Sequence, residues 1–266
     1  MKDDLGDRIK SNYEDKYRIY LPKKTYVIAR IDGKAFHSYA KDCEKPFDAG
    51  LIEDMNTTAL ALCKQVSGAQ LAYVQSDEIS LLLTDFAKEN TSPWFDNNLQ
   101  KLASVSASVA TVEFNKHRLL RSGVNPTEYR WANFDARFFA IDDPVEVKNY
   151  FVWREVDAMR NSVSMIARSY FSHKELENKN VAEMRQMLEA QGINWLDFNM
   201  GLRNGRVVVK RQTTSDVVFF NKKTQKEEFI SGVTRNEWSV EDAPVFSKSD
   251  FLEQFIPQKA NFEKLD

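Results

Sequence analysis

The sequence predicts an α+β (α/β) protein in which a ferredoxin-like βαββαβ unit is followed by a mostly helical C-terminal lobe. Two observations predict this fold. Over the first 143 residues, short β-rich apolar runs alternate with amphipathic helical stretches in the order β-α-β-β-α-β. From Pro144 onward, long helical periodicity replaces that alternation. We therefore expect two lobes, residues 1–143 and residues 144–266.

The elements of the first lobe follow from apolar periodicity and turn residues. An amphipathic N-terminal helix is predicted because apolar residues recur every four positions, at Leu5, Ile9, Tyr13 and Tyr17. Two further helices are expected, at 48–68 with Asp48 as its N-cap and at 97–117, with strands at 26–31, 71–74, 79–83 and 133–141. In this order the helices cover one face of the sheet and leave the other face open for a ligand.

The second lobe has less regular patterns. A long helix is expected to reach about residue 172, and a shorter helix covers 181–191. A polar pair of strands is expected at 206–210 and 216–220. From residue 227 onward, aromatic and charged residues follow no clear period.

The composition is that of an ordinary globular protein. The 266 residues include 37 Lys and Arg against 39 Asp and Glu, a net charge of −2. No run of 18 apolar residues occurs, and the acidic start is not followed by an apolar stretch, so we expect neither a membrane span nor a signal peptide. The two cysteines, Cys43 and Cys63, indicate a reducing, cytoplasmic location.

The spacing of a few residue types excludes several classes of enzyme. No two of the nine glycines lie two positions apart, and none are spaced as in a P-loop, which excludes both common phosphate-binding glycine motifs. The three histidines and two cysteines are scattered, which argues against a zinc site. An enzyme built from this chain must therefore use carboxylates and cations.

Acidic residues follow two strands that the βαββαβ order makes neighbours. Asp32 ends the first strand, and Asp77 with Glu78 occupies the turn between the second and third strands. Carboxylates this close repel one another unless they share a proton or hold cations, and hard oxygen ligands suit Mg²⁺. Two such ions could stabilise the attacking and leaving oxygens of a phosphoryl displacement. The alternative is that both aspartates are simply turn residues.

Cations near these acids could neutralise a triphosphate. Arg30 and Lys34 flank Asp32, Lys45 precedes the first helix of the sheet unit, and Lys101 lies in the first turns of the second. For each lysine alone, a solvated surface position is the simpler interpretation.

The long helix carries polar residues on one face. Tyr150, Arg154, Asp157, Asn161 and Arg168 are separated by three, four or seven positions. An aromatic ring with two arginines suits stacking and phosphate contacts with RNA. The alternative is a structural ion pair between Arg154 and Asp157, buried against the other lobe.

Three motifs together resemble the tRNA-His guanylyltransferase family. Residues 30–37 read RIDGKAFH, residues 75–80 read QSDEIS and residues 153–157 read WREVD. The closer similarity is to the bacterial and archaeal branch of the family, the 3′–5′ RNA polymerases, and it extends from residue 5 to about residue 210. The resemblance implies a polymerase-like palm in residues 1–143, with RNA-binding and oligomer contacts in residues 144–266.

The resemblance also implies a reaction and its site. Members add nucleotides to the 5′ end of tRNA after ATP or GTP activates its 5′ phosphate, use two Mg²⁺ ions, and are usually homotetramers. The implied metal ligands are Asp32, Asp77 and the Gly33 carbonyl, with Glu78 as a further catalytic acid. The implied nucleotide contacts are Arg30, Asp32, Gly33, Lys34, Ala35, Phe36, His37, Lys45, Asp48, Ser76, Asp77 and Lys101. The RNA contacts that we expect are those on the long helix, Tyr150, Arg154, Asn161 and Arg168.

One departure from the family pattern bears on specificity. Where the eukaryotic branch has His-Ile-Asn-Asn, which includes the histidine that recognises the tRNA-His anticodon, this chain has Met159 through Ser162. A basic residue before the second helix is likewise replaced, by Asn98. We therefore expect template-dependent repair of truncated tRNA 5′ ends, with G addition to tRNA-His as the alternative.

Two alternatives come from other classes of protein. A nucleotide cyclase shares the palm and its carboxylates, but its hairpin reads Gly-Gly-Asp-Glu-Phe in diguanylate cyclases, where this chain has QSDE. A non-catalytic RNA-binding module of this fold should carry aromatic and basic residues on its strands, where this chain carries carboxylates.

Overall fold

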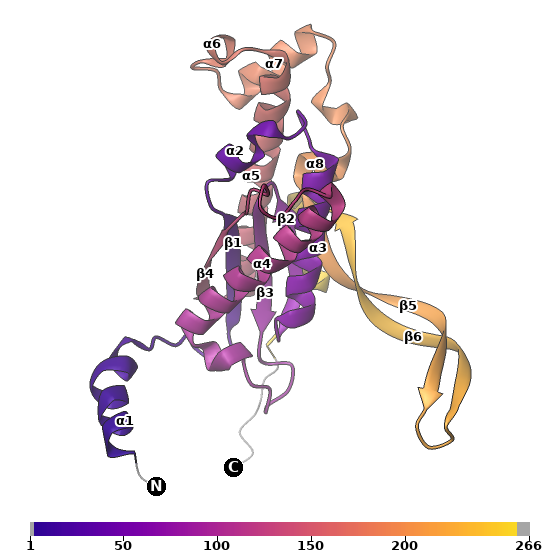
Figure 1. The fold of residues 1–266 in the computed structure, drawn as a ribbon. Coiled ribbons are helices and arrows are strands. Elements are labelled where there is room, and N and C mark those ends of the chain that lie inside the picture. Colours follow the sequence, from indigo (N-terminus) through magenta and orange to yellow (C-terminus); the bar gives the residue numbers. More distant parts are fainter. Residues whose placement is uncertain (1–2, 260–266) are drawn as a thin grey trace.

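The computed structural model describes residues 3–259, which form a six-stranded antiparallel sheet with helices on both faces (Figure 1). The strands lie in the order β4-β1-β3-β2-β5-β6. Their bounds are β1 Tyr26–Gly33, β2 Ala69–Gln75, β3 Glu78–Thr84, β4 Phe134–Ile141, β5 Arg206–Asn221 and β6 Lys226–Asp242. The order of the first four strands is that of the predicted βαββαβ unit, so the predicted α+β fold is confirmed.

The predicted pair of helices covers one face of the sheet. These helices are α3 (Ala49–Gln65) and α4 (Leu99–Ser122). Odd-numbered residues of β1, namely Val27, Ala29 and Ile31, are buried against them. As predicted, Asp48 is the N-cap of α3, because its carboxylate accepts the N–H of Leu51 at 2.6 Å.

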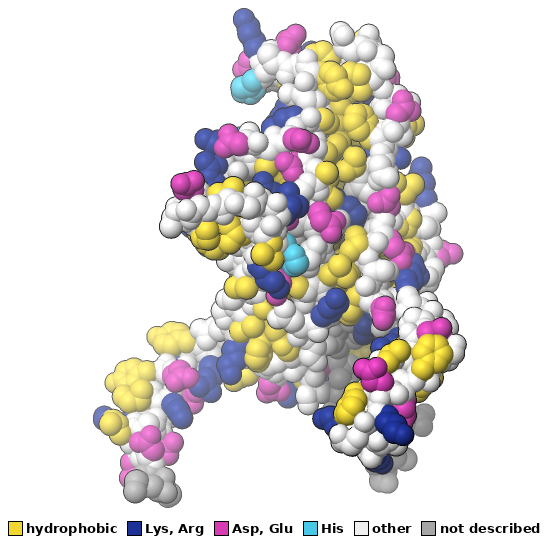
Figure 2. All heavy atoms as spheres, turned by 45° about the vertical axis from the view of Figure 1, so that its right-hand side comes forward, with side chains coloured by type: hydrophobic (Ala, Val, Ile, Leu, Met, Phe, Trp, Pro, Cys, Tyr) yellow, Lys and Arg dark blue, Asp and Glu magenta, His cyan; other side chains and the backbone are white. Residues whose placement is uncertain are grey.

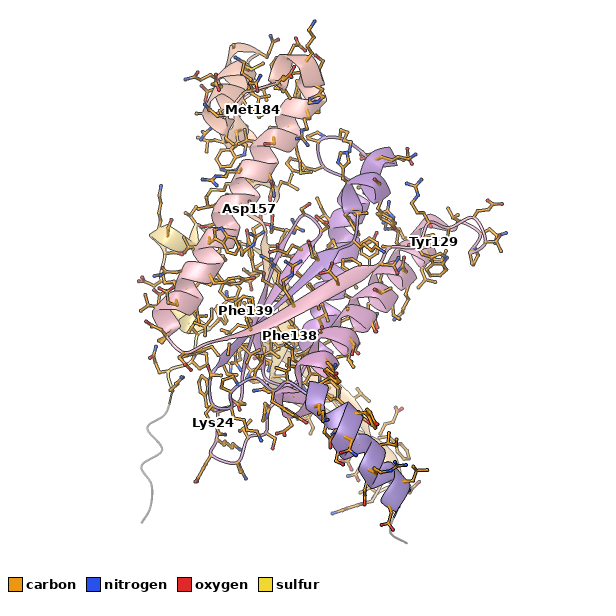
Figure 3. The ribbon with its side chains drawn as sticks, turned by 90° about the vertical axis from the view of Figure 1, so that its left-hand side faces the viewer. Lys24, Tyr129, Phe138, Phe139, Asp157 and Met184 are labelled. Atoms are coloured by element: carbon orange, nitrogen blue, oxygen red, sulfur yellow. The ribbon has the colours of Figure 1, made fainter. Side chains whose placement is uncertain are left out.

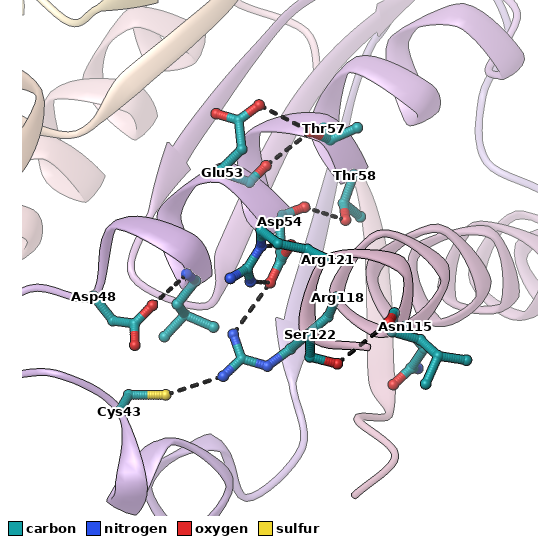
Figure 4. A network of polar contacts seen from close by, with 12 residues as sticks. Cys43, Asp48, Glu53, Asp54, Thr57, Thr58, Asn115, Arg118, Arg121 and Ser122 are labelled. Carbon is teal, nitrogen blue, oxygen red and sulfur yellow. Dashed lines mark hydrogen bonds and ion pairs between the residues drawn. The ribbon is translucent and has the colours of Figure 1, made fainter. Parts of the chain in front are cut away.

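A buried acid joins α3 to α4. Asp54, 2% exposed, accepts a bond from Arg118 at 3.1 Å and pairs with Arg121 (Figure 4). Arg118 also donates to the thiol sulfur of Cys43 at 3.4 Å, in the segment that leads into α3. The charge of Asp54 is compensated on two sides, as burial of a carboxylate requires.

The opposite face of the sheet is not open. The long helix α5 (Pro144–Tyr170) lies across it, and even-numbered β1 residues such as Tyr26 and Ile28 pack with Val147 and Phe151 of that helix. On β4, Phe138 and Phe139 point to opposite faces of the sheet (Figure 3). The prediction of a free second face is therefore wrong, because α5 carries the apolar stripe that buries it.

The C-terminal part of the chain returns to the sheet. The two short strands expected at 206–210 and 216–220 are one continuous strand, β5, which pairs with β2 from Leu71 to Val74. Its partner β6 covers the first part of the region for which the sequence shows no period, up to Asp242. Beyond the sheet, β5 and β6 continue as a two-stranded arm that extends away from the body (Figure 1).

Four short helices lie toward the same end of the molecule (Figure 1). They are α2 (Phe36–Tyr39), α6 (His173–Leu176), α7 (Val181–Ala190) and α8 (Met200–Asn204). The C-terminal half of α5 packs against α7 through a separate apolar cluster that includes Ile166 and Leu188.

The N-terminal helix is shorter than predicted. Helix α1 spans Asp4–Ile9, and the chain continues through one π turn and one 3₁₀ turn to Tyr17. No residue of these segments is buried, and the predicted apolar face is exposed, with Leu5 at 61% and Tyr17 at 72%.

Within residues 3–259, no helix combines the length and apolar character needed to cross a bilayer.

Candidate active site

The predicted acidic residues meet where two central strands end. Asp32 lies opposite Glu78 in the β1–β3 pairing, and the N–H of Gly33 donates to the carbonyl oxygen of Asp77 at 3.1 Å. The end of β1 and the turn between β2 and β3 are therefore joined by the backbone. This pairing brings Asp32 and Asp77 together, as the sequence predicted.

A row of polar side chains crosses the sheet at this level. Asp135 of β4, Asp32 of β1, Glu78 of β3 and Gln75 of β2 are successive partners across the four strands. Asp135 is not among the residues predicted from the sequence. The register of β4 against β1 sets this exposed carboxylate directly beside Asp32. The missing information was the pairing of β4, which no local pattern specifies.

The electrostatics of the pair favour a cation. Burial raises the pKa of Asp77 to about 6, and the nearby charge of Asp32 adds to this shift. A hydrogen bond from the Ser76 hydroxyl at 2.9 Å acts in the opposite direction. Burial, together with the charge of Asp135, also raises the pKa of Asp32. Arg137, Arg30 and Arg154 oppose the shift of Asp32 only in part, so the ionised carboxylates are incompletely compensated here.

The donor set fits magnesium. Two carboxylates and backbone carbonyls are hard oxygen ligands, which Mg²⁺ prefers, and it commonly takes one or two carboxylates and completes its shell with water and substrate phosphates. Throughout residues 3–259, no three His, Cys, Asp or Glu side chains form a ready-made metal cage. Substrate phosphates would therefore have to supply part of the coordination.

Glu78 is held by an ion pair with α5. Its two oxygens accept bonds from Nε and Nη2 of Arg154, each at 2.7 Å, and Arg154 also donates to Asp157 at 2.9 Å. Both partners of the Glu78–Arg154 pair are buried, at 7% and 6% exposure. This ion pair positions α5 over the acidic row, and the catalytic role that we expect for Glu78 stays a prediction.

Both loops that flank the acids contain unusual backbone conformations. Ala35 has φ 53° and Ser76 has φ 47°, in the left-handed region that non-glycine residues rarely adopt. At Gly33 a Cβ atom would lie 2.2 Å from the ring of Phe36, so only glycine fits there. Such strain is typical of functional loops that their surroundings hold in place.

A hollow lies beside Asp77, between α3 and α5. It is lined by residues that include Phe47, Asp48, Ser76, Asn161, Met165 and Arg206. Two of the predicted nucleotide contacts, Asp48 and Ser76, line this hollow together with Asn161, which we had expected to contact RNA. The arrangement offers apolar walls and a few polar groups, as ligand pockets usually do.

The predicted cations are distributed unevenly. Lys34 and His37 are exposed just after β1, and Lys45 is exposed on the segment that leads into α3, at the same end of the sheet as Asp32. Arg30 lies two residues before Asp32 on β1, on the face that α5 covers. Its guanidinium is 5.8 Å from the ring centre of Trp153.

Lys101 lies toward the other end of the sheet. The N–H of Phe134, the strand partner of Gly33, donates to the hydroxyl of Thr111 on α4 at 3.1 Å. Lys101 comes ten residues earlier on α4, about 15 Å along the helix axis. The expectation that it serves the same triphosphate as Asp32 is therefore wrong within one protomer.

Half of the predicted RNA-binding face is buried. Tyr150 is 8% exposed and its hydroxyl lies 2.7 Å from that of Ser80, while Arg154 is held by Glu78. The structure contradicts both residues as RNA contacts. Arg154 pairs with Asp157, as the alternative predicts, but its buried partner is Glu78. Asn161 and Arg168 are exposed.

The comparisons with known proteins agree with one another. A family model described as tRNAHis guanylyltransferase matches residues 6–142. A bacterial tRNA(His) guanylyltransferase-like protein in complex with ATP is similar in structure, with a TM-score of 0.81 and 40% identity over 95% of this chain and 99% of that one. A second such structure, in complex with GTP, has a TM-score of 0.73 and 38% identity over 96% and 99%. The tRNA(His) guanylyltransferase of Debaryomyces hansenii is 28% identical over 72% of this chain and 76% of that protein.

Replacing Arg154 with alanine should strongly destabilise the fold, because Glu78 then remains buried without a partner. We expect the free energy of unfolding to fall by about 3–5 kcal/mol, measured by guanidinium denaturation. The matched control is Lys148→Ala on the same helix, where the partly exposed pair with Glu253 should contribute less than about 1 kcal/mol. Equal losses in the two variants would contradict a fixing role for the buried pair.

The raised pKa of Asp77 predicts a pH-dependent stability in the absence of metal. Between about pH 4 and pH 6 the folded state holds a proton that the unfolded state releases, so this group's contribution falls as pH rises. Asp77→Asn should therefore be stabilising relative to wild type, and more so at pH 7 than at pH 4, in denaturation curves recorded with EDTA. The exposed Asp250→Asn serves as the control. A difference that stays constant with pH would refute the assignment.

Proposed function

This chain belongs to the tRNAHis guanylyltransferase family and is a nucleotidyltransferase, and from that premise we propose that it adds nucleotides to the 5′ end of truncated tRNA in the 3′–5′ direction, following the opposite strand as template. The observation that carries the proposal is the meeting of Asp32 and Asp77 beside the hollow between α3 and α5. Oxygen ligands at a strand edge, next to a hollow with apolar walls and a few polar groups, suit phosphoryl transfer.

The proposed reaction has two displacements. In the first, a 5′-phosphate oxygen of the tRNA attacks the α-phosphorus of ATP or GTP, and pyrophosphate leaves. In the second, the 3′-hydroxyl of the incoming nucleotide attacks the activated 5′ phosphate, and the nucleoside monophosphate leaves. Bacterial relatives hold ATP or GTP in their solved structures, which supports both nucleotides as substrates here.

The residues of this chain would position the reactants. Asp48 and Ser76 line the hollow that we assign to a nucleotide, and exposed Lys45 stands on the segment before α3, where it could reach a triphosphate. Asp32, Asp77 and the Gly33 carbonyl would hold up to two Mg²⁺ ions. When bound, these ions would neutralise phosphate charge and stabilise the attacking and leaving oxygens.

We assign template-directed repair rather than anticodon reading because Met159 replaces the histidine that the resemblance assigns to anticodon recognition. G addition to tRNA-His is the second candidate, and it is favoured by relatives such as the Debaryomyces hansenii tRNA(His) guanylyltransferase.

Free thiols at Cys43 and Cys63 suit a reducing, cytoplasmic compartment.

The experiment offers tRNAs that lack their first 5′ nucleotide and carry different anticodons, together with Mg²⁺ and labelled nucleotides. We expect extension rates within about tenfold of one another, a spread of about 1.4 kcal/mol, and an added base that pairs with the opposing one. Extension of tRNA-His alone, or G addition whatever the opposing base, would replace repair with the guanylyltransferase assignment.

Two pairs of variants test the residues in the same assay. Asp77→Asn should abolish addition, whereas Asp250→Asn should not. Lys45→Ala should raise the nucleotide concentration needed about tenfold, as loss of a charge-assisted phosphate contact does, while exposed Lys64→Ala on α3 should leave it unchanged.

We also propose a homotetramer. Two parts of the chain that project from the body carry exposed apolar side chains (Figure 2). They are α1, with Leu5 and Ile9, and the β5–β6 arm, with Phe220 and Phe229. Each of these four side chains is at least 45% exposed. A second copy of the chain would cover them. Light scattering should give a mass near four times 30.8 kDa, and Leu5→Glu with Ile9→Glu should lower it. A monomeric wild type would refute the proposal.

A further inference from the structure

We propose that a basic hollow on the β4 side of the acidic residues binds the single-stranded 3′ end of the tRNA. The basic hollow is lined by Lys34, Ser38, Lys41, Arg130, Trp131 and Asn133, among others, and its volume is about 420 Å³, within the range of known ligand sites. This inference rests on the proposed function, because it assigns part of the RNA substrate to a surface next to the acids. Lys34 and Ala35, two of the nucleotide contacts that the resemblance implies, stand at its edge.

The location of the basic hollow follows from the strand order. The N–H of Lys34 donates to the carbonyl oxygen of Asn133 at 2.8 Å, one residue beyond the pairing of Gly33 with Phe134. The basic hollow therefore begins two residues after Asp32, on the β4 side of β1. The hollow between α3 and α5 lies on the other side, beside the β2–β3 turn. The acids thus stand between a proposed nucleotide site and the basic hollow.

The charge of the basic hollow suits an RNA backbone. Lys34, Lys41 and Arg130 all line it and all are exposed. Arg130 is held across it by bonds to the carbonyl oxygens of Ser38 at 3.0 Å and Tyr39 at 3.5 Å. One carboxylate lies nearby, since Asp42 is 3.7 Å from Arg130 and 4.0 Å from Lys41, so cations remain in excess.

An exposed aromatic ring completes the basic hollow. Trp131 is 54% exposed, and the ring of Tyr129 meets it edge-on, with centroids 4.9 Å apart and planes at 78°. Tyr129 lies on the loop between α4 and β4, which extends beyond the sheet (Figure 3). A supported tryptophan with an exposed ring is a platform on which a base can stack.

Cations around a stacking ring are typical of sites for single-stranded nucleic acid. A duplex would offer phosphates but no free base face, and an acidic peptide would not need the ring. When the 5′ strand of an acceptor stem ends at the acids, the opposite strand continues past them as an unpaired 3′ end. The basic hollow lies where that strand could continue. Binding of the 3′ end there, with one base stacked on Trp131, would keep the template base in register.

The test measures RNA binding by the full chain, without nucleotides. The probes are a 5′-truncated tRNA with its single-stranded 3′ end and the same tRNA with that end trimmed, titrated by fluorescence anisotropy. Wild type should bind the intact tRNA more tightly. Trp131→Ala should weaken binding of the intact tRNA about tenfold, and Lys41→Ala should also lower the slope of log affinity against log salt by about 0.7. Neither should change binding of the trimmed tRNA.

Controls separate this inference from general effects. Lys88→Ala removes an exposed lysine after β3, toward the opposite end of the sheet, and should leave both affinities unchanged. Trp131→Phe should restore most of the binding, because it keeps a stacking ring. Equal binding of intact and trimmed tRNA by wild type, or equal losses for both tRNAs in the variants, would overturn the inference.

The outcome is distinguishable from that of the proposed function. If wild type extends no tRNA but binds the 3′ end through Trp131, the proposed function fails and the basic hollow stands. If wild type extends truncated tRNA while Trp131→Ala and Lys41→Ala bind the intact tRNA as wild type does, the basic hollow is refuted and the function stands.

Discussion

The register of β1 against β3 is the constraint on which the rest of the molecule depends. Side chains alternate along a strand, so the pairing of Asp32 with Glu78 also directs Val27, Ala29 and Ile31 to the α3–α4 face. A slip of one residue would exchange the two faces of β1 and move Asp32 into the apolar core. The burial of that core therefore fixes the position of the carboxylates, and site geometry and stability have the same origin.

The ion pair between Glu78 and Arg154 couples the second layer to the site. A buried pair seldom adds much net stability over apolar residues, but its loss is costly, so its main effect is to define one arrangement. Here it specifies where α5 crosses the sheet, directly over the acidic row. The same helix contributes Asn161 to the hollow beside Asp77. The Glu78–Arg154 pair therefore positions both the part of α5 that covers the acidic row and the part that lines this hollow.

Asp32 and Asp77 are only partly compensated, in contrast to Asp54 and Glu78. Each of those two buried carboxylates has arginine partners, whereas burial raises the pKa of Asp77 to about 6. An enzyme that binds magnesium together with its nucleotide benefits from such a site, because the substrate brings the missing cation. In the function that we propose, the exposed cations of the basic hollow would serve RNA and leave the acids free for metal.

Four features could be predicted from the sequence alone: the order of the first four strands, the N-cap at Asp48, the acidic strand ends and the family. These features are local, because periodicity, turn residues and short motifs record them directly. Three others became visible only in the folded chain: α5 closes the second face, β5 joins β2, and Asp135 lies beside Asp32 while Lys101 does not. Those outcomes depend on which distant segments pair, and the pairing energy comes from surfaces that no single stretch of sequence contains.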